Sequence, residues 1–461
     1  MKNGLIALTI LCCLGITACG SGNEDTPTPP TPTVTPTPDP EPEPEPEVKV
    51  PTGKAIYIPY DFKDKDLTKE TSEWCYQRAR WTDDIIVFWA KGFGNDLSKA
   101  PSLQGQNMKV AIDNLLKKLQ EFYDYYYDTL KFVTAGKTKA DKYRMMVMLD
   151  YSLEGTAYGG SYDNEIGALW IAPNRVQDKN LNACAHEIGH SFQLQIIADG
   201  EGDAWGGSGF YEMTSQWMLW QVNPDWTSEE YYHLEAFKDA THKAFLHLDN
   251  IYRSPYVIEM WGQRHGLPFI ADLFRNGKIG EDPVMTYKRL AGVDQEAFND
   301  EMWDNYAHLV NWDIDRVREK TKGYRDIWHT SYTDAGDGWQ RVAKANCPEN
   351  YGFNIYKINN IPASGKVTVE FRGEAGANGY VNMRKDAAGW RYGFVAVDDK
   401  GKVTYSTPAS DPNGSIVYEI PEGAKPSRLH LVVMGAPTQH WMNPENGTDA
   451  QWPYSIRITN D

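Results

Sequence analysis

The segment His186-Glu187-Ile188-Gly189-His190 combines two imidazoles and one carboxylate at a spacing that suits metal chemistry. On a helix, positions i and i+4 lie on one face, so His186 and His190 can bind a single zinc ion at ~2.0–2.1 Å. This geometry leaves Glu187 beside the water that the metal activates, where a carboxylate serves as general base. The alternative is a helix that buries two hydrogen-bonded histidines without a metal.

A catalytic zinc site needs a third protein ligand, and the acids that follow His190 are the candidates. Asp199, Glu201 and Asp203 lie close to a glycine-rich segment that must reverse the chain. Glu212 instead opens a new helical run, far enough along for one helix to end and a second helix to lie beside it. We therefore predict Glu212 as the third ligand, with Asp203 in reserve. The predicted site has three metal ligands and one catalytic residue: His186, His190 and Glu212, with Glu187.

The helix that carries both histidines needs a buried stripe to hold it in place. Leu181, Ala185, Ile188 and Phe192 recur at the spacing of such a stripe. A strand is predicted just upstream, over Ile166–Ala172, and we expect it to be an edge strand that pairs with the backbone of an extended peptide.

The rest of residues 51–332 reads as one mixed domain. Asn107–Leu130 is predicted to be a long amphipathic helix, because its apolar residues recur every three or four positions. A glycine-rich loop is expected over 155–160. From Asn180 to Arg325 the pattern is mostly helical, which predicts a helical subdomain. Further strands are predicted at Lys54–Pro59, Asp84–Ala90 and Tyr143–Leu149.

Residues 333–461 change character, because short apolar runs alternate with Gly, Pro, Asn and Asp turns. This regular spacing predicts an appended β-sandwich of the jelly-roll type, so the whole chain is expected to be α+β. Four tryptophans in this part either fill the sandwich core or stack on sugar rings: Trp339, Trp390, Trp441 and Trp452. The predicted strands are Lys366–Arg372, Arg391–Val397, Ser415–Ile420, Arg428–Met434 and Tyr454–Thr459.

The HEIGH motif and the later glutamate in GSGFYEMTSQW resemble the gluzincin zinc metallopeptidases, in which a glutamate on a second helix completes the metal site. The stretch HEIGHSFQ is also similar to enhancin-like peptidases that attack mucin-type glycoproteins. The resemblance implies a zincin-like catalytic domain with one Zn²⁺, which would hydrolyse peptide bonds in extracellular proteins or glycoproteins. The long metzincin pattern is excluded, because it needs Gly and His where this chain has Gln193 and Ile196.

One position departs from the gluzincin pattern. Many gluzincins place an aspartate four residues after the glutamate ligand, where it orients a zinc histidine, whereas this chain has Gln216 there. Glutamine can still accept a hydrogen bond but polarises the imidazole less. The resemblance also implies a Tyr or His that stabilises the oxyanion. Spacing leaves six candidates for that donor: Tyr231, Tyr232, His233, Tyr252, Tyr256 and His265.

The first residues carry the pattern of an export signal, with Lys2 followed by a short apolar stretch from Gly4 to Ala18. Ile16-Thr17-Ala18-Cys19 resembles the lipobox of bacterial lipoproteins. This implies a signal peptide over 1–18 and an acylated Cys19 that attaches the protein to a membrane. The alternative is an ordinary secretory signal that is cleaved after Ala18.

Residues 19–50 are predicted to be a disordered tether, because Pro, Thr and Glu dominate them. The small and acidic residues directly after Cys19 resemble the surface-export signal of some Gram-negative lipoproteins. We therefore expect an outer-membrane lipoprotein that is exposed on the cell surface, with its lipid as the only membrane contact.

The composition of the chain limits the classes of protein and of partner that fit it. Apolar residues make up 41% of the chain, which excludes disorder throughout. The net charge of −17 makes nucleic acid an unfavourable partner. Two other readings stay open beside the peptidase: a surface protein that binds glycans or glycoproteins through a degenerate zincin body and a tryptophan-rich module, and a structural lipoprotein with a non-catalytic metal site.

Overall fold

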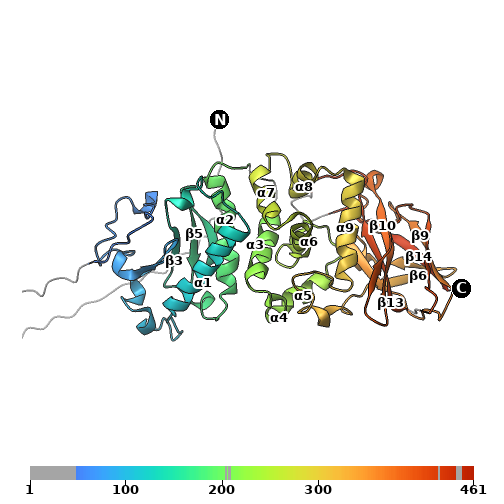
Figure 1. The fold of residues 1–461 in the computed structure, drawn as a ribbon, viewed down its shortest axis with the longest axis horizontal. Coiled ribbons are helices and arrows are strands. Elements are labelled where there is room, and N and C mark those ends of the chain that lie inside the picture. Colours follow the sequence, from blue (N-terminus) through green and yellow to red (C-terminus); the bar gives the residue numbers. More distant parts are fainter. Residues whose placement is uncertain (1–47, 203–204, 206–208, 424–425, 443–448, 461) are drawn as a thin grey trace, which may run out of the picture. The chain divides into compact units, whose positions relative to one another are not determined.

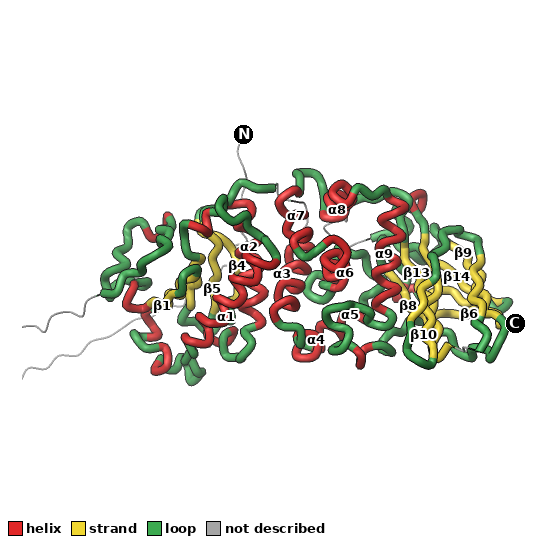
Figure 2. The backbone as a smooth tube through the Cα atoms, viewed as in Figure 1, coloured by secondary structure: helices red, strands yellow, loops and turns green. Residues whose placement is uncertain are grey.

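The computed structural model describes residues 48–202, 205, 209–423, 426–442 and 449–460, and these form an α+β structure (Figures 1 and 2). Val48–Asp461 clusters as one compact unit. The predicted signal peptide, Cys19 and nearly all of the predicted tether lie outside the described residues, as does Asp203. Within the described part of the chain, no helix is both long and apolar enough to cross a membrane.

The first β-sheet has the strand order β1-β2-β3-β5-β4. The three central strands, β2, β3 and β5, run parallel to one another. The edge strands β1 and β4 are antiparallel to β2 and β5, respectively. The central strands are buried on both faces because helices and long connecting segments cover them. The bounds are β1 Ala79–Trp81, β2 Ile85–Trp89, β3 Met145–Leu149, β4 Ala157–Tyr162 and β5 Ile166–Ile171.

The edge of this sheet differs from the prediction. The strand predicted over Ile166–Ala172 is β5, which pairs on both sides, and the edge beside the candidate site is β4. Residues 155–160 were expected to form a loop, yet Gly159 and Gly160 belong to β4. A Cβ at Gly159 would lie 1.8 Å from the Glu187 carbonyl oxygen, so glycine here serves close packing of strand on helix rather than a turn.

Two helices pack on this sheet and on each other: α1, Ile112–Asp124, and α2, Asn182–Ala198. The predicted helix over Asn107–Leu130 is shorter at its start, and its end continues as a π-helical turn, Tyr125–Thr129. Lys54–Pro59 was wrongly predicted as a strand. Only an isolated bridge forms there, between Ala55 and Tyr143.

The mostly helical character predicted after Asn180 is observed. Helix α3 packs against α2 and α6, and the helices that follow enclose a shared apolar core with them. The remaining bounds are α3 Gly209–Val222, α4 Trp226–Glu229, α5 Tyr231–Lys238, α6 Tyr256–His265, α7 Pro268–Asn276, α8 Pro283–Ala291 and α9 Gln295–Leu309.

The last part of the chain folds as two antiparallel sheets, with orders β11-β10-β13-β8 and β12-β9-β14-β7-β6. Strands from β7 to β14 are distributed between the sheets as in a jelly roll, and β6 adds to one edge. Trp390 and Trp452 fill the core between the sheets, whereas Trp339 and Trp441 are partly exposed. The bounds are β6 Tyr332–Gly336, β7 Trp339–Val342, β8 Phe353–Lys357, β9 Lys366–Gly373, β10 Trp390–Asp398, β11 Val403–Tyr405, β12 Ser415–Glu419, β13 Pro426–Gly435 and β14 Tyr454–Asn460.

The outer face of the β11-β10-β13-β8 sheet is not exposed to solvent. Val395, Val432 and Met434 belong to the same apolar core as the helices, and α9 packs directly on β10 and β13 (Figure 1). The Trp303 indole of α9 donates to the Val432 carbonyl at 3.2 Å. The sandwich is therefore joined to the helices by a continuous core rather than appended through a linker.

Candidate metal centre

Helices α2 and α3 approach closely at the point where the motif lies. A Cβ at Gly189 would lie 2.6 Å from Ser215 Oγ, so only a very small residue fits between the helices here. Ser215 in turn donates to the His186 carbonyl oxygen. The predicted stripe of Leu181, Ala185, Ile188 and Phe192 is buried and holds the other side of α2 in the core. This packing fixes the register between α2 and α3.

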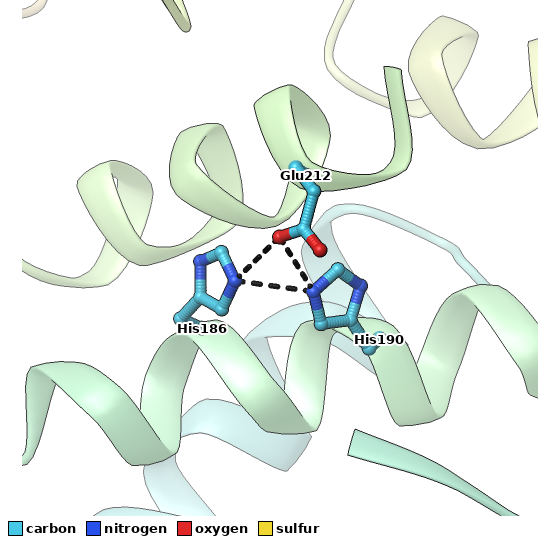
Figure 3. Close-up of side chains that lie close together, drawn as sticks. All are labelled: His186, His190 and Glu212. Atoms are coloured by element: carbon cyan, nitrogen blue, oxygen red, sulfur yellow. Dashed lines mark hydrogen bonds and ion pairs between the residues drawn. The ribbon is translucent and has the colours of Figure 1, made fainter. Parts of the chain in front are cut away.

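The three predicted metal ligands meet between these helices (Figure 3). His186 and His190 extend from α2, and Glu212 extends toward them from the first turn of α3. His186 Nε2, His190 Nε2 and Glu212 Oε2 are each 3.1 Å from the other two atoms. Tetrahedral ligands at ~2.0–2.1 Å from a zinc ion lie about 3.3 Å apart, so this spacing fits the ion. Among the described residues, this is the one such cluster of His, Cys, Asp and Glu side chains.

Two glutamines orient the imidazoles, one for each histidine. Gln216 Nε2 donates to the Tyr252 carbonyl at 2.9 Å, which turns its Oε1 toward His186 Nδ1 at 2.7 Å. Gln193 does the same for His190, because its Nε2 donates to the Tyr211 carbonyl and its Oε1 lies 2.9 Å from His190 Nδ1. Since an amide oxygen only accepts, each Nδ1 carries the hydrogen.

This tautomer decides what fits between the side chains. With Nδ1 protonated, a neutral imidazole presents a lone pair at Nε2. Two such lone pairs and a carboxylate oxygen then converge with no hydrogen between them, an arrangement that a cation stabilises. In the absence of a cation, protons would have to lie between the three atoms instead. Two imidazoles and one carboxylate are a donor set that suits a zinc ion.

Without a cation, protons at Nε2 of the imidazoles take its place, and the pKa values of the cluster shift accordingly. Burial alone would raise the pKa of Glu212, but hydrogen bonds and charge from His186 and His190 outweigh burial and hold that pKa well below its usual range. Burial would lower the pKa of His190, yet Glu212 raises it above the ordinary value. Glu212 is therefore a carboxylate at neutral pH, as a metal ligand must be.

Glu187 faces the edge strand from the same helix. Its Oε2 accepts a hydrogen bond from the Gly159 N–H of β4 at 2.8 Å, and its side chain is half-buried. The carboxylate is thus held in a fixed place at the side of the cluster, where it could accept a proton from a water or a substrate.

Two cavities of about 280 Å³ each adjoin the cluster, one toward each end of α2. His186, Glu187 and Tyr252 line both cavities, so the cluster sits at their junction. The cavity toward the end of α2 has mostly aromatic and apolar walls, which include Tyr158, Leu194 and Tyr211. The cavity toward the start of α2, termed the polar cavity, has more charged and polar side chains in its walls, among them Arg175, Asn182 and Glu230.

Of the six Tyr and His residues considered as oxyanion donors, Tyr252 lies closest to the cluster. Its ring centroid is 6.1 Å from that of His186, and burial, followed by the charge of Glu212, raises the pKa of its hydroxyl to about 12. Tyr232 and His233 line the polar cavity. The other three are engaged elsewhere: Tyr231 packs on Tyr324, Tyr256 is fully buried, and His265 hydrogen-bonds to Tyr287.

Two of the acids near the glycine-rich segment, and the cysteine of α2, take no part in the cluster. Asp199 accepts from the backbone N–H of Lys139, and Glu201 accepts from the Thr134 hydroxyl. Cys184 is a buried free thiol, and burial raises its pKa, which suits a packing role. Neither acid nor the thiol joins the cluster.

Sequence reasoning missed Gln193 and Gly159 as parts of the site. Gln193 lies three residues after His190 on α2, the one signal that it shares a face with that histidine. It was read only as a departure from another zinc motif. Gly159 gave no signal, because its contact with Glu187 depends on how β4 crosses α2.

Comparisons with solved structures find distant likenesses. The catalytic module of the metalloprotease ZmpA from Clostridium perfringens is 11% identical, covers 78% of this chain and 68% of its own, and has a TM-score of 0.31. The CBM22-1 xylan-binding domain of Xyn10C from Paenibacillus barcinonensis is 14% identical over 29% of this chain and 82% of its own, with a TM-score of 0.17. At such TM-scores neither likeness supports an argument.

Accessory secretory protein 1, 2 and 3 of Streptococcus pneumoniae is similar at 7% identity over 29% of this chain and 86% of its own, with a TM-score of 0.17. No curated protein sequence matches the chain. A family profile, in contrast, matches residues 48–461, which is the whole compact unit. The chain therefore belongs to the family of unknown function DUF6055.

Proposed function

We propose that this chain is a zinc-dependent peptidase that hydrolyses peptide bonds of extracellular proteins or glycoproteins. The observation that carries the proposal is the convergence of three acceptor atoms, each 3.1 Å from the others, with both imidazoles turned by glutamines so that their lone pairs meet. A carboxylate, two cavities and a free strand edge lie around that point.

The chemistry divides between the ion and the side chains. A zinc ion held by His186, His190 and Glu212 would lower the pKa of a water toward ~7 and polarise the substrate carbonyl. Glu187 takes the proton of the attacking water and passes it to the leaving nitrogen. Tyr252 donates its hydroxyl hydrogen to the developing oxyanion, since a tyrosine hydroxyl is protonated at neutral pH.

The edge strand gives the substrate its direction. The Gly159 N–H points away from β5 toward Glu187, so the backbone groups of Ala157, two residues earlier on β4, also face the cleft. An extended peptide pairs with that edge and passes over the cluster. Its side chains on either side of the scissile bond then enter the two cavities.

The location of the enzyme rests on sequence alone. We propose attachment through acylated Cys19 to the outer membrane, with the body displayed at the cell surface on the tether. Extracellular substrates fit that location. Metabolic labelling with an alkyne fatty acid is expected to mark the full-length protein and not a Cys19→Ala variant.

A second candidate function is glycan or glycoprotein binding by the sandwich. Trp339 is partly exposed on the five-stranded sheet, with Arg372 4.1 Å and Arg457 5.0 Å from its ring centroid. Both guanidiniums lie over the ring, and their N–H groups next to a partly exposed tryptophan could donate to sugar hydroxyls. Loss of glycan binding in a Trp339→Ala variant supports this role, and it leaves the peptidase proposal untouched.

The deciding experiment combines metal analysis with digestion. A chain of residues 48–461 is expected to contain one zinc per chain and to cleave members of a proteome-derived peptide library, and a chelator should abolish the cleavage. Glu187→Gln is expected to keep the zinc and to lose hydrolysis by several orders of magnitude. Undiminished cleavage by that variant, or cleavage that persists without metal, contradicts the proposal.

A further inference from the structure

The polar cavity beside the metal ligands has charged side chains in its walls, and only some of them are free to bind a substrate group. It is lined by Arg175, Asn182, Glu230, Tyr232 and His233, together with His186 and Glu187. Arg175 follows β5, whereas Glu230 directly precedes α5, so the two charged residues come from separate segments of the chain. Which of these charges can receive a substrate depends on the hydrogen bonds that each already makes.

Glu230 is already satisfied by its neighbours. Its Oε1 accepts from Asn182 at 2.9 Å, and its Oε2 accepts from the Trp226 indole at 3.0 Å and the Tyr232 hydroxyl at 3.3 Å. His233 Nε2 lies 3.4 Å from the same oxygen. With three partners on Oε2 and one on Oε1, this carboxylate is held in the wall of the cavity and is less available to a basic group than a free one.

Arg175, in contrast, has terminal nitrogens that are free to bind a substrate group. Its Nε donates to the Gly155 carbonyl at 2.9 Å, which anchors the guanidinium next to the start of β4. No described acid forms an ion pair with it, and its side chain is exposed. It is the one Lys or Arg that lines either cavity within the described part of the chain. Its two terminal nitrogens can therefore bind a carboxylate in the bidentate manner.

We propose that Arg175 makes this cavity select a carboxylate that the substrate carries next to the scissile bond. The inference rests on the proposed peptidase function and names its substrate class. The carboxylate comes from an acidic side chain or from a free C-terminus, since the two groups offer the same chemistry to a guanidinium. In a chain with a net charge of −17, the unpaired cation at the cleft provides a local attraction for such a group.

The test uses inhibitors that do not depend on hydrolysis. Peptide hydroxamates bind the metal through the hydroxamate group, so the adjacent residue is held at a fixed place in the cleft. The compounds differ only in that residue and in its terminal group. Three have an amidated C-terminus and carry Glu, Gln or Lys, and the fourth carries Gln with a free C-terminal carboxylate. Dissociation constants are measured with the zinc-loaded full-length protein.

Wild type is expected to bind the Glu compound or the free-carboxylate compound at least about tenfold more tightly than the amidated Gln compound. The stronger of the two identifies the source of the carboxylate. In Arg175→Gln this ratio falls toward one, and Arg175→Glu shifts the preference to Lys. Arg384→Gln removes an exposed arginine of the sandwich and is expected to keep the wild-type ratio.

Equal binding of all compounds by wild type overturns the proposal, whatever their affinity. So does an acid preference that survives in Arg175→Gln while thermal unfolding shows that variant to be folded. A protein that prefers the acidic compounds but cleaves no peptide retains this site and loses the proposed hydrolysis. The two proposals therefore fail separately.

Discussion

At the scale of single residues, the site depends on two glutamines as much as on its ligands. A carboxylate beside a zinc histidine raises the basicity of that imidazole, whereas the amides of Gln193 and Gln216 supply orientation without charge. The departure at position 216 therefore preserves the hydrogen bond that the site needs. Gln193 extends the same arrangement to the second histidine.

Removing either amide is expected to weaken metal binding. Gln216→Leu and Gln193→Leu should each lower zinc affinity about 10- to 100-fold, because the imidazole loses the acceptor that fixes its tautomer and rotation. Competition with a chromophoric chelator measures the affinity. Gln340→Leu, an exposed change in the sandwich, serves as control. Unchanged affinity in both leucine variants would contradict the role.

At the scale of elements, the site is made where β4 crosses α2. A Cβ at Gly159 would lie 1.8 Å from the Glu187 carbonyl oxygen and 2.8 Å from His190 Cβ. Both neighbours belong to α2, the helix that carries the HEIGH motif, and the nearer atom is backbone. Close contact also lets the Gly159 N–H reach the Glu187 carboxylate. The strand and the helix therefore position the Glu187 carboxylate, the proposed general base, together.

Gly159→Ala is expected to separate β4 from α2. Overpacking against backbone should cost about 1–3 kcal/mol in the free energy of unfolding and should reduce peptide cleavage, since Glu187 loses its partner. Chemical denaturation and cleavage assays measure the two effects. Gly323→Ala, where a Cβ meets nothing within 4 Å, is the matched control. Wild-type stability and activity for Gly159→Ala would show that the contact is not needed.

At the scale of the whole compact unit, the sandwich and the helices share buried polar groups as well as an apolar core. Glu349 accepts from the Ala244 N–H at 2.8 Å and lies 3.5 Å from Lys243 Nζ. Asp449, from the loop before β14, is 3% exposed. Burial, followed by the charge of Glu349, raises the pKa of Asp449 to about 7. Ionising this aspartate works against the folded state.

Asp449 should therefore make stability depend on pH. Its folded-state pKa lies above the unfolded value of ~3.9, so its penalty is absent below about pH 4 and grows as the pH rises to about 7. Asp449→Asn is expected to be more stable than wild type by roughly 2–4 kcal/mol at pH 8 and equal to it at pH 4. Denaturation at both pH values measures the difference. A pH-independent difference would contradict the assignment.

The shared core also predicts how truncation behaves. A chain that ends at residue 332 exposes the face of α9 that carries Trp303, along with the apolar groups that covered the sheet. We expect it to aggregate or to bind a hydrophobic dye, as measured by light scattering and fluorescence. A chain that begins at residue 48 keeps the compact unit and is the control. A soluble, cooperatively unfolding 48–332 fragment would show that the helices do not need the sandwich.

The sequence by itself determined the features that depend on local spacing. The i, i+4 pair His186 and His190, the later Glu212, and the change from a helical part to a strand-rich part follow from periodicity and from residue types, because these patterns act within one element or between adjacent ones. The outer limits of most sandwich strands were also readable, since turn residues mark their ends.

Only the tertiary structure decided which elements face one another. The edge position of β4, the glutamine amides behind each histidine, the place of Tyr252 and the sealed face of the sandwich all depend on contacts between distant segments. A glycine in a strand and a glutamine on a helix carry no sign of their partners in one sequence, because packing and hydrogen bonding act across space rather than along the chain.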